Sequence, residues 1–534
     1  MRPVKRSGRR SELFAVAVAL LLGASPPSGA ATTTTAPAPS VGSWTVYHGA
    51  PDGDGVAAAV TSVNLSTRAW TSPTLDGQLY GEPLAWDGHV FVATENDTVY
   101  ALSTSTGAAA WSTHLGTPVP SSALPCGDIS PTVGITGTPV VDPARSEVFV
   151  VADELVDQRP AHELIGLDAT TGKVVLTRNV DPAGSSPAAL LQRTGLTLDT
   201  NRVVFGFGGN FGDCSTYHGW VVAVPETGGP NEDFAVDSGA GQSQGAVWMG
   251  GAAPVVDSSG NIWVEPGNGS VTTASRPYDD SDSVLELSPA LTIIQYFAPS
   301  SWATENASDL DLATAPALLS DGQVVAAGKD RTAYLLNGTH LGGIGGELSS
   351  LPDACGQVID GGPAFVGTTV FLPCMSGTVA VRASSAPAGL RILWSATSGG
   401  GPPIVAAGLV WSIGQNGTLY GLSATSGAVV QRASVGAPAN HFPTPAIGDG
   451  LLLVASSTDV VAFSVATANG GQGTTTTVVT SSPSTSNHTT SGTASASSGT
   501  PAWVILVIVL GVLALGSGIV WWWLRRRRAG RISS

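Results

Sequence analysis

One short phrase recurs along most of this chain: a proline, a short apolar strand, an Asp/Gly-type turn and a valine-rich strand. Pro83–Gly88 precedes Val90–Val92 in this way, and Pro254–Asp257 precedes Ile262–Val264. The same start returns at Pro139, Pro316, Pro363, Pro403 and Pro445. Successive starts lie 56, 115, 62, 47, 40 and 42 residues apart. Self-similarity at such a period indicates one repeat architecture rather than several unrelated domains.

The interval of 115 residues is two units long, and Leu196–Asp199 before Val203–Phe205 fills it without a proline. A second phrase, a strand followed by a Thr-Gly or Ser-Gly turn, closes some units at Gly107, Gly172 and Gly427. Glycine permits the positive φ of such tight turns. The pattern therefore predicts an all-β fold, an eight-bladed β-propeller of four-stranded antiparallel blades.

The last unit ends near Val465, one strand short of a full blade. We expect the segment around Trp44–Tyr47 and Val60–Leu65 to supply the missing strand, so that an N-terminal strand closes the ring and covers an exposed edge. A row of separate β-sandwiches is the alternative architecture, but unlinked sandwiches have no need for so regular a phrase. The propeller is predicted over residues 41–466.

The proline start and the close Ala-Leu-x-x-x-Thr-Gly-x-x-x-Trp, as at Ala101–Trp111, resemble the quinoprotein-type propeller built from pyrroloquinoline-quinone (PQQ)-like repeats. The resemblance covers the whole predicted body. That family includes quinone-dependent alcohol and polyvinyl-alcohol dehydrogenases as well as non-enzymatic scaffolds of outer-membrane protein assembly. Its outer-strand tryptophan docks neighbouring blades; here Trp70, Trp111 and Trp394 stand at matching positions, although ordinary packing would also explain them.

The resemblance also suggests a catalytic and metal-binding constellation. It implies Asn268, after Gly267, as a ligand of a calcium ion, together with Asp309 and Asp311 of an Asp-x-Asp motif. Asp309 would be the general base that takes the alcohol proton, and Lys329 the cation that stabilises the reduced quinone. Trp248 would be the planar floor under the cofactor. PQQ and Ca²⁺ are the cofactors that this resemblance implies.

Three features depart from the dehydrogenase pattern. Neutral Asn210 stands near the place of a carboxylate metal ligand, and Cys126 is followed by Gly127 instead of a second cysteine. The chain has no Cys-x-x-Cys-His motif for haem attachment. Asn268, Asp309 and Asp311 can also be read as turn residues that close blades. We therefore expect a ligand- or protein-binding module or scaffold, with a PQQ/Ca²⁺-dependent dehydrogenase of an alcohol or sugar as the alternative.

Two further clusters bear on chemistry. Four cysteines in an exported chain are expected to pair, and of the three possible connectivities we favour Cys126–Cys214 with Cys355–Cys374. The acidic run Tyr278–Asp282 lacks the spaced ligand loop of an EF-hand, and we interpret it as a solvated loop.

The N-terminus predicts export. Five basic residues within the first ten positions precede the short apolar run Leu13–Gly23 and the small residues Ser28-Gly29-Ala30. This order is typical of a cleaved signal peptide, which we place at residues 1–30 and follow with a spacer at 31–40.

The C-terminus predicts a membrane anchor. Residues 474–500 contain 18 Ser or Thr in 27 positions, so residues 467–500 read as a disordered stalk. Ala502–Leu524 is uncharged, and four arginines follow it directly. We predict a transmembrane helix at 501–524 and a basic cytoplasmic tail at 525–534. The expected protein is a single-pass protein of the cell membrane in a bacterial envelope, with its propeller outside the cytoplasm.

The charge of the remaining chain limits the classes of partner that it can bind. Between the two basic ends, residues 31–500 carry 13 Lys or Arg and 38 Asp or Glu, a net charge of −25. So acidic a surface repels phosphate backbones, which argues against nucleic acid as a partner. The expected partners are the membrane and an unknown small-molecule or protein ligand at the funnel of the propeller.

Overall fold

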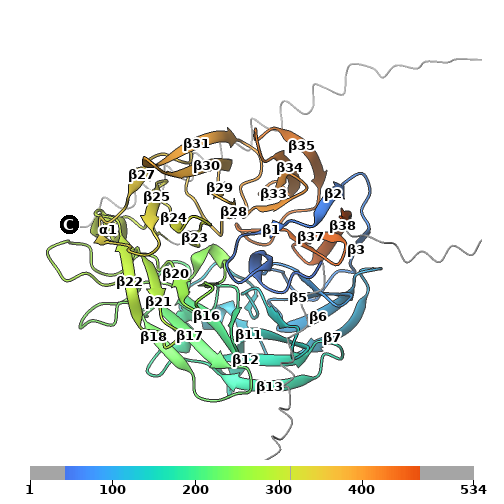
Figure 1. Ribbon diagram of the computed structural model, residues 1–534. Helices are drawn as coiled ribbons and strands as arrows, with labels where there is room; N and C mark the ends of the chain where they lie inside the picture. The colour runs from blue at the N-terminus through green and yellow to red at the C-terminus, as the bar shows by residue number, and fades with distance from the viewer. Residues whose placement is uncertain (1–41, 313, 469–534) are drawn as a thin grey trace, which may run out of the picture. The chain divides into compact units, whose positions relative to one another are not determined.

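The computed structural model describes residues 42–312 and 314–468, which belong to the first of the two units, 1–471 and 472–534, into which the chain divides. Eight sheets surround a central axis like the blades of a propeller (Figure 1). Within the described ranges, no helix has the length and apolar character needed to span a bilayer. The predicted signal, spacer, transmembrane helix and tail, and all but the first two residues of the stalk, lie outside these ranges.

Each blade has four antiparallel strands, numbered here outward from the axis. Blade 1 contains β4 (Leu84–Trp86), β5 (His89–Ala93), β6 (Thr98–Ser103) and β7 (Ala109–His114). Blade 2 contains β10 (Val140–Asp142), β11 (Glu147–Val156), β12 (Arg159–Asp168) and β13 (Val174–Asn179). Blade 3 contains β15 (Thr197–Asp199), β16 (Arg202–Gly209), β17 (Trp220–Pro225) and β18 (Glu232–Ala235). Blade 4 contains β19 (Val255–Val256), β20 (Ile262–Val264), β21 (Val284–Leu287) and β22 (Ile293–Ala298).

The second half of the ring repeats this plan. Blade 5 contains β23 (Ala317–Leu318), β24 (Gln323–Ala327), β25 (Ala333–Asn337) and β27 (Ser349–Leu351). Blade 6 contains β28 (Ala364–Val366), β29 (Thr369–Cys374), β30 (Gly377–Ser385) and β31 (Ala388–Ala396). Blade 7 contains β32 (Ile404–Ala406), β33 (Leu409–Gly414), β34 (Thr418–Ser423) and β35 (Val429–Ser434). Blade 8 contains β36 (Ala446–Gly448), β37 (Leu451–Ser456), β38 (Asp459–Thr467) and β2 (Val60–Asn64).

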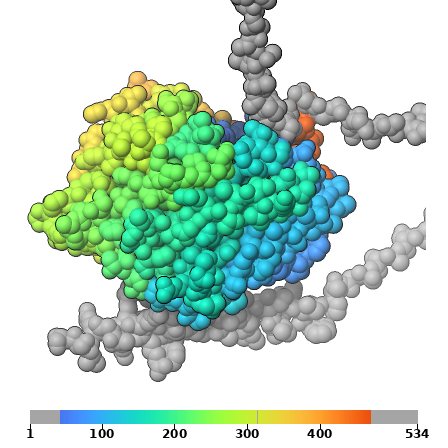
Figure 2. All heavy atoms as spheres, turned by 90° about the horizontal axis from the view of Figure 1, so that it is seen from below, coloured from blue at the N-terminus to red at the C-terminus, as the bar shows by residue number. Residues whose placement is uncertain are grey.

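Short elements connect or extend the blades. They are η1 (Tyr47–Gly49), β1 (Val56–Ala57), β3 (Trp70–Thr71), β8 (Val119–Pro120), η2 (Ser121–Ala123), β9 (Thr132–Val133), η3 (Pro187–Ala189), β14 (Leu190–Leu191), η4 (Met249–Gly251), α1 (Trp302–Asn306) and β26 (Gly343–Ile344). The blades of the N-terminal half lie side by side along the edge of the ring shown in Figure 2.

All eight predicted units are confirmed as blades. Seven innermost strands begin directly after the repeated proline, and the eighth, β15, begins directly after Leu196. The Asp-Gly turns of the phrase are tight hairpins: Asp87 and Gly88 have φ of 49° and 77°. Two consecutive positive φ values fit a type I′ turn, whose twist matches that of the flanking strands.

An N-terminal strand closes the ring, as predicted for Val60–Leu65. β2 pairs antiparallel with β38 and becomes the outermost strand of blade 8. The prediction for Trp44–Tyr47 was wrong, because this segment lies at the axis and not on the outer edge. Trp44 exchanges both backbone hydrogen bonds with Ala85 of β4, at 2.8 and 2.9 Å.

Residues 42–57, the axial segment, run past the innermost strands of most blades. Backbone N–H groups in or beside six innermost strands donate to its carbonyl groups: Asp449 to Gly42, Ala85 to Trp44, Val141 to Thr45, Val256 to Pro51, Phe365 to Asp54 and Val405 to Gly55. β1, which lies toward the centre of the ring in Figure 1, also pairs parallel with β32. Buried backbone donors need partners, and the axial segment supplies them where the inner edges of the sheets would otherwise be open.

Tryptophans dock neighbouring blades as the resemblance implied. Trp111 of blade 1 donates from Nε1 to Ala169 O of blade 2 at 3.0 Å, and Trp394 of blade 6 to Ala424 O of blade 7 at 3.0 Å. Trp70 docks blade 8 on blade 1 in the same way. A Cβ added at Gly107 would lie 2.5 Å from the Trp70 ring, so the glycine of the closing turn leaves room for the indole as well as adopting φ of 71°.

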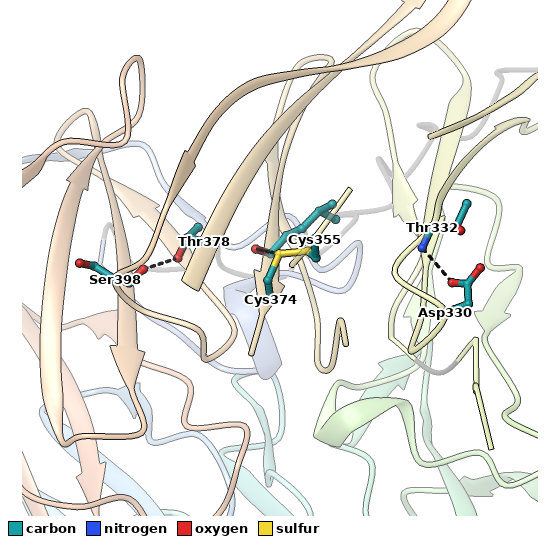
Figure 3. Close-up of a disulfide and its surroundings, with 7 residues drawn as sticks. Asp330, Thr332, Cys355, Cys374, Thr378 and Ser398 are labelled. Carbon is teal, nitrogen blue, oxygen red and sulfur yellow. Dashed lines mark hydrogen bonds between the residues drawn. A yellow bond between two sulfur atoms is a disulfide. The ribbon is translucent and has the colours of Figure 1, made fainter. Parts of the chain in front are cut away.

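Both disulfides have the pairing favoured from the sequence. Cys126 lies in the connection between blades 1 and 2 and bonds to Cys214 in the β16–β17 connection of blade 3. Cys355, between blades 5 and 6, bonds to Cys374 at the end of β29 (Figure 3).

Ring closure through β2 predicts a face-specific effect of a charge. Val63 is 6% exposed in the core, whereas the neighbouring Ser62 faces solvent. We expect Val63→Asp to lower the free energy of unfolding by about 3 kcal/mol, because a carboxylate would be buried without a partner. Ser62→Asp is the matched control and should change it by less than about 0.5 kcal/mol in urea denaturation. Equal losses would show that β2 does not bury this face.

Candidate functional site

Five residues singled out by the sequence occupy connections at one end of the ring. Trp248 lies between blades 3 and 4, Asn268 between β20 and β21, Asp309 and Asp311 between blades 4 and 5, and Lys329 between β24 and β25. In four-stranded antiparallel blades, the connection from second to third strand and the connection to the next blade lie at the same end. These five residues, the rim site, therefore share one rim of the propeller.

The rim site is centred on the Lys329 ammonium group. Lys329 Nζ lies 2.9 Å from Asp309 Oδ1 and 2.6 Å from Asp311 Oδ2. It also lies 5.2 Å from the centroid of the Trp248 ring. The backbone N–H of Asn268 donates to Asp311 Oδ1 at 2.8 Å. The structure thus brings together all five residues that the sequence proposed, and Asp311 connects Asn268 to Lys329.

The two carboxylates of this site differ in exposure. Asp311 is 4% exposed and Asp309 is 71% exposed at the side chain. Burial alone would lower the pKa of Lys329, but Asp311 and then Asp309 outweigh it and raise the pKa above its ordinary value. Lys329 is therefore a permanent cation. An ammonium group has three N–H donors, and two are used by these carboxylates, which leaves one for an acceptor atom of a ligand.

Further carboxyl groups lie near the rim site. Asp282 is fully buried; burial raises its pKa well above the ordinary value, and the charges of Asp311 and Glu305 add to this. Interpreting Tyr278–Asp282 as a solvated loop was therefore wrong, since Asp279 is also only 1% exposed. Asp360, from the connection between blades 5 and 6, has a pKa raised to about 6, mainly by burial. The surroundings of Lys329 are acidic.

Two residues that sequence reasoning missed extend the site. Phe442, between blades 7 and 8, has its ring centroid 5.6 Å from that of Trp248. Arg193, only 7% exposed, lies over the Phe442 ring at 5.4 Å and the Tyr80 ring at 5.8 Å. No carboxylate of the described residues forms an ion pair with Arg193. No local sequence signal marks these residues, because the closure of the ring brings blade 8 to the site.

The donors fit calcium incompletely. Asn210 offers an amide where the resemblance expects a carboxylate, and its Nδ2 donates to Ala188 O at 2.9 Å. Across residues 42–312 and 314–468, no group of three or more His, Cys, Asp or Glu side chains is arranged to hold a metal ion. Lys329 already neutralises part of the charge of Asp309 and Asp311, and a hard divalent cation prefers unpaired carboxylates. A cation and an aromatic floor for a quinone are present, but the calcium site is short of donors.

Comparison with known proteins finds one matching family model and several similar structures. The family model described as "Outer membrane protein assembly factor BamB" matches residues 34–275. Quinohemoprotein alcohol dehydrogenase from Comamonas testosteroni has a similar structure, with a TM-score of 0.59 and 15% identity over 79% of this chain and 80% of its own. A europium-containing methanol dehydrogenase is also similar, with a TM-score of 0.56 and 14% sequence identity over 79% of this chain and 98% of its own. BamB from Moraxella catarrhalis has a TM-score of 0.48 and 15% sequence identity over 74% of this chain and 97% of its own. No curated protein matches this sequence. At these identities the structural likeness shows the fold alone.

Proposed function

Because this chain is an eight-bladed propeller of the quinoprotein-type, PQQ-like repeat family, we propose that it is a binding module whose rim site captures a ligand. Its place is the outer side of a bacterial cell membrane, where residues 501–524 tether it through the Ser/Thr-rich segment before them. The export signal and the anchor are proposals from the sequence. The family description, an outer-membrane assembly factor, supports a binding role but does not name the ligand.

One observation carries this proposal: the Lys329 ammonium group is held by two carboxylates near the Trp248 face and keeps one donor for a ligand. Phe442 extends the aromatic surface toward Arg193, a second cation without a carboxylate partner in the described ranges. Two cations along an aromatic surface suit a planar ligand that carries acceptor oxygens.

A PQQ-dependent dehydrogenase of an alcohol or sugar is the second candidate. The observation in its favour is the convergence of Trp248, Asn268, Asp309, Asp311 and Lys329, in the positions that the resemblance assigned to floor, metal ligands, base and cation. The incomplete calcium donors count against it. We assign no reaction step to the rim site, because the residues present do not complete the site of the metal.

PQQ is a useful probe, since it is planar and carries acceptor oxygens. We expect PQQ to raise the melting temperature of the full-length chain with or without Ca²⁺, and to bind Lys329→Met at least about tenfold more weakly, a loss of about 1.4 kcal/mol. No dye should be reduced when alcohols and sugars are added. Lys173→Met, at an exposed lysine of blade 2, is the matched control and should bind PQQ like the wild type.

The outcomes separate the two candidates. Ca²⁺-dependent dye reduction that is lost in Asp309→Asn would replace the binding module by the dehydrogenase. Asp309 is largely exposed, so this variant does not leave a buried charge unpaired, as Lys329→Met does at Asp311. Unchanged melting of the wild type with PQQ would remove both the dehydrogenase and this class of ligand from the rim site.

A further inference from the structure

The connection between β20 and β21, residues 265–283, is much longer than its counterpart in blade 1, residues 94–97. Connections of this length without secondary structure are uncommon in compact domains and usually serve a function. It contains the acidic run Tyr278–Asp282, of which Asp279 is only 1% exposed. The rim site uses Asn268 of this connection and none of these aspartates, so their burial needs an explanation of its own.

A second buried carboxylate meets Asp279 at this connection. Asp237, which follows β18 of blade 3, is also 1% exposed. The point at which a Cβ would stand on Gly269 lies 2.6 Å from Asp279 Oδ2 and 2.7 Å from Asp237 Oδ2. Glycine leaves this space open, and the two carboxylates converge on it from separate connections. Carboxylates so placed repel each other unless a proton or a cation lies between them.

Asp279 and the glycine are held in position by hydrogen bonds. Asp279 Oδ2 accepts the backbone N–H of Val271 at 3.1 Å, and its Oδ1 accepts the hydroxyl of Ser281 at 2.6 Å. Asn306 of α1 accepts the N–H of Gly269 at 2.6 Å and donates to Val271 O at 2.8 Å. An ionised carboxylate oxygen has more than one acceptor site, so Asp279 Oδ2 can also contact a cation.

Asp237 lacks such partners. Both of its carboxylate oxygens are buried and accept no hydrogen bond within the described part of the chain. The backbone N–H of Ser270 donates to Ser243 O at 3.0 Å. Burial raises the pKa of Asp237 to about 9, and the charge of Asp279 adds to this. Buried carboxyl groups are nearly always paired or bound to a metal, so Asp237 is the group that a missing partner would satisfy.

We propose that Asp237 and Asp279 bind a calcium ion in the space left open by Gly269. Calcium prefers carboxylate oxygens, with bonds about 2.3–2.6 Å long, and one ion supplies the partner that Asp237 lacks. An ion of this size is enclosed by its ligands and covers their oxygens. The burial of these oxygens from water therefore fits a bare cation, whereas it excludes an organic molecule.

The donor set indicates a weak site. Across residues 42–312 and 314–468, no third His, Cys, Asp or Glu side chain completes a metal-binding group with these two. Backbone carbonyl groups and water would complete the coordination, which calcium accepts. We expect Kd of about 0.1–1 mM, as in calcium sites of extracellular modules. This proposal does not depend on the ligand of the rim site, and it uses neither Asp309 nor Asp311.

Titration of the full-length chain with CaCl₂, after treatment with EDTA, tests the site. We expect saturable binding in calorimetry, and a rise of about 2 °C or more in melting temperature at about 10 mM Ca²⁺. MgCl₂ at the same concentration controls for screening of the acidic surface and should have much less effect, because Mg²⁺ demands a smaller, near-octahedral site. Absence of saturable calcium binding, or equal effects of the two salts, would overturn the proposal.

An amide in place of either carboxylate identifies the ligands. Asp237→Asn should weaken calcium at least about tenfold, and its melting temperature in EDTA should equal or exceed that of the wild type, because an amide does not repel Asp279. Asp279→Asn should also weaken calcium. Asp157→Asn is the matched control, since Asp157 is an exposed aspartate with φ of 50°, close to the 56° of Asp237. Wild-type calcium affinity in Asp237→Asn would place the ion elsewhere and overturn the assignment.

Discussion

Replacing Cys126 and Cys214 together by alanine is expected to lower the free energy of unfolding by roughly 4–5 kcal/mol. The bond joins residues separated by 88 positions, and the closed loop contains all of blade 2 and the first two strands of blade 3. Cross-linking a long loop removes much of the conformational freedom of the unfolded chain, so its loss costs more than the loss of a short loop. Denaturation in urea without reductant measures the difference.

The second disulfide is the matched control for this effect. Cys355 and Cys374 are separated by 19 positions, so the paired alanine variant should lose only about 3 kcal/mol on the same loop-entropy basis. A larger loss from the short loop than from the long one would show that native contacts around the bonds, and not loop closure, set their contribution.

Stability is expected to fall as the pH rises from about 5 to 8. Glu265 is fully buried, and burial raises its pKa to about 8, well above its unfolded value near 4.3. The folded state therefore keeps a proton that the unfolded chain releases within this window. The contribution is fully present below the unfolded pKa and is lost as the pH rises toward the folded pKa, by up to about 1.4 kcal/mol per pH unit for one group.

Glu265→Gln isolates this contribution. Glu265 Oε2 accepts the N–H of Thr314 at 3.0 Å and its hydroxyl at 2.8 Å, whereas Oε1 has no partner in the described ranges, so an amide keeps both bonds. Melting temperatures at pH 5, 6, 7 and 8 should fall less steeply in this variant than in the wild type. Asp52→Asn, at an exposed carboxylate of the axial segment, is the matched control. Parallel slopes for all three proteins would contradict the assignment to Glu265.

Glu82 contributes in the same direction. Burial raises its pKa to about 8, although it accepts hydrogen bonds from Trp44 Nε1 and the backbone N–H of His48. Glu95 and Asp153, with pKa values raised to about 7 by burial, act likewise. A residual pH dependence in Glu265→Gln is therefore expected.

Much of the blade architecture could be predicted from the sequence because the signals are local. The repeated proline precedes an innermost strand, and glycine at Gly107 or Gly172 both turns the chain and receives a tryptophan of the neighbouring blade. The axial segment could not be placed in this way. Trp44 and Tyr47 look like residues of a strand, but their backbone partners belong to separate blades and no pattern within the segment specifies them.

The residues of the rim site likewise fall into those that the sequence could predict and those that it could not. Asn268, Asp309, Asp311 and Lys329 follow strand ends whose order fixes their common rim, so the resemblance could bring them together. The pairing of Lys329 with both carboxylates was not predicted, because it depends on side-chain distances. Arg193, Phe442 and Asp237 gave no signal at all, since their chemistry arises from rings and buried charges that only packing reveals.

The axial segment also determines the order in which the propeller can assemble during synthesis. Its bonding partners extend to Asp449, so the earliest part of the body to leave the ribosome finds its last neighbours only when almost the whole body has been made. Until then the axial segment cannot form all of its hydrogen bonds at the centre of the ring, and β2 cannot pair with β38. Contacts so distant in sequence make folding slow. A nascent chain of this kind exposes unpaired strand edges until its two ends meet, and during that time it must be kept from aggregating with other chains.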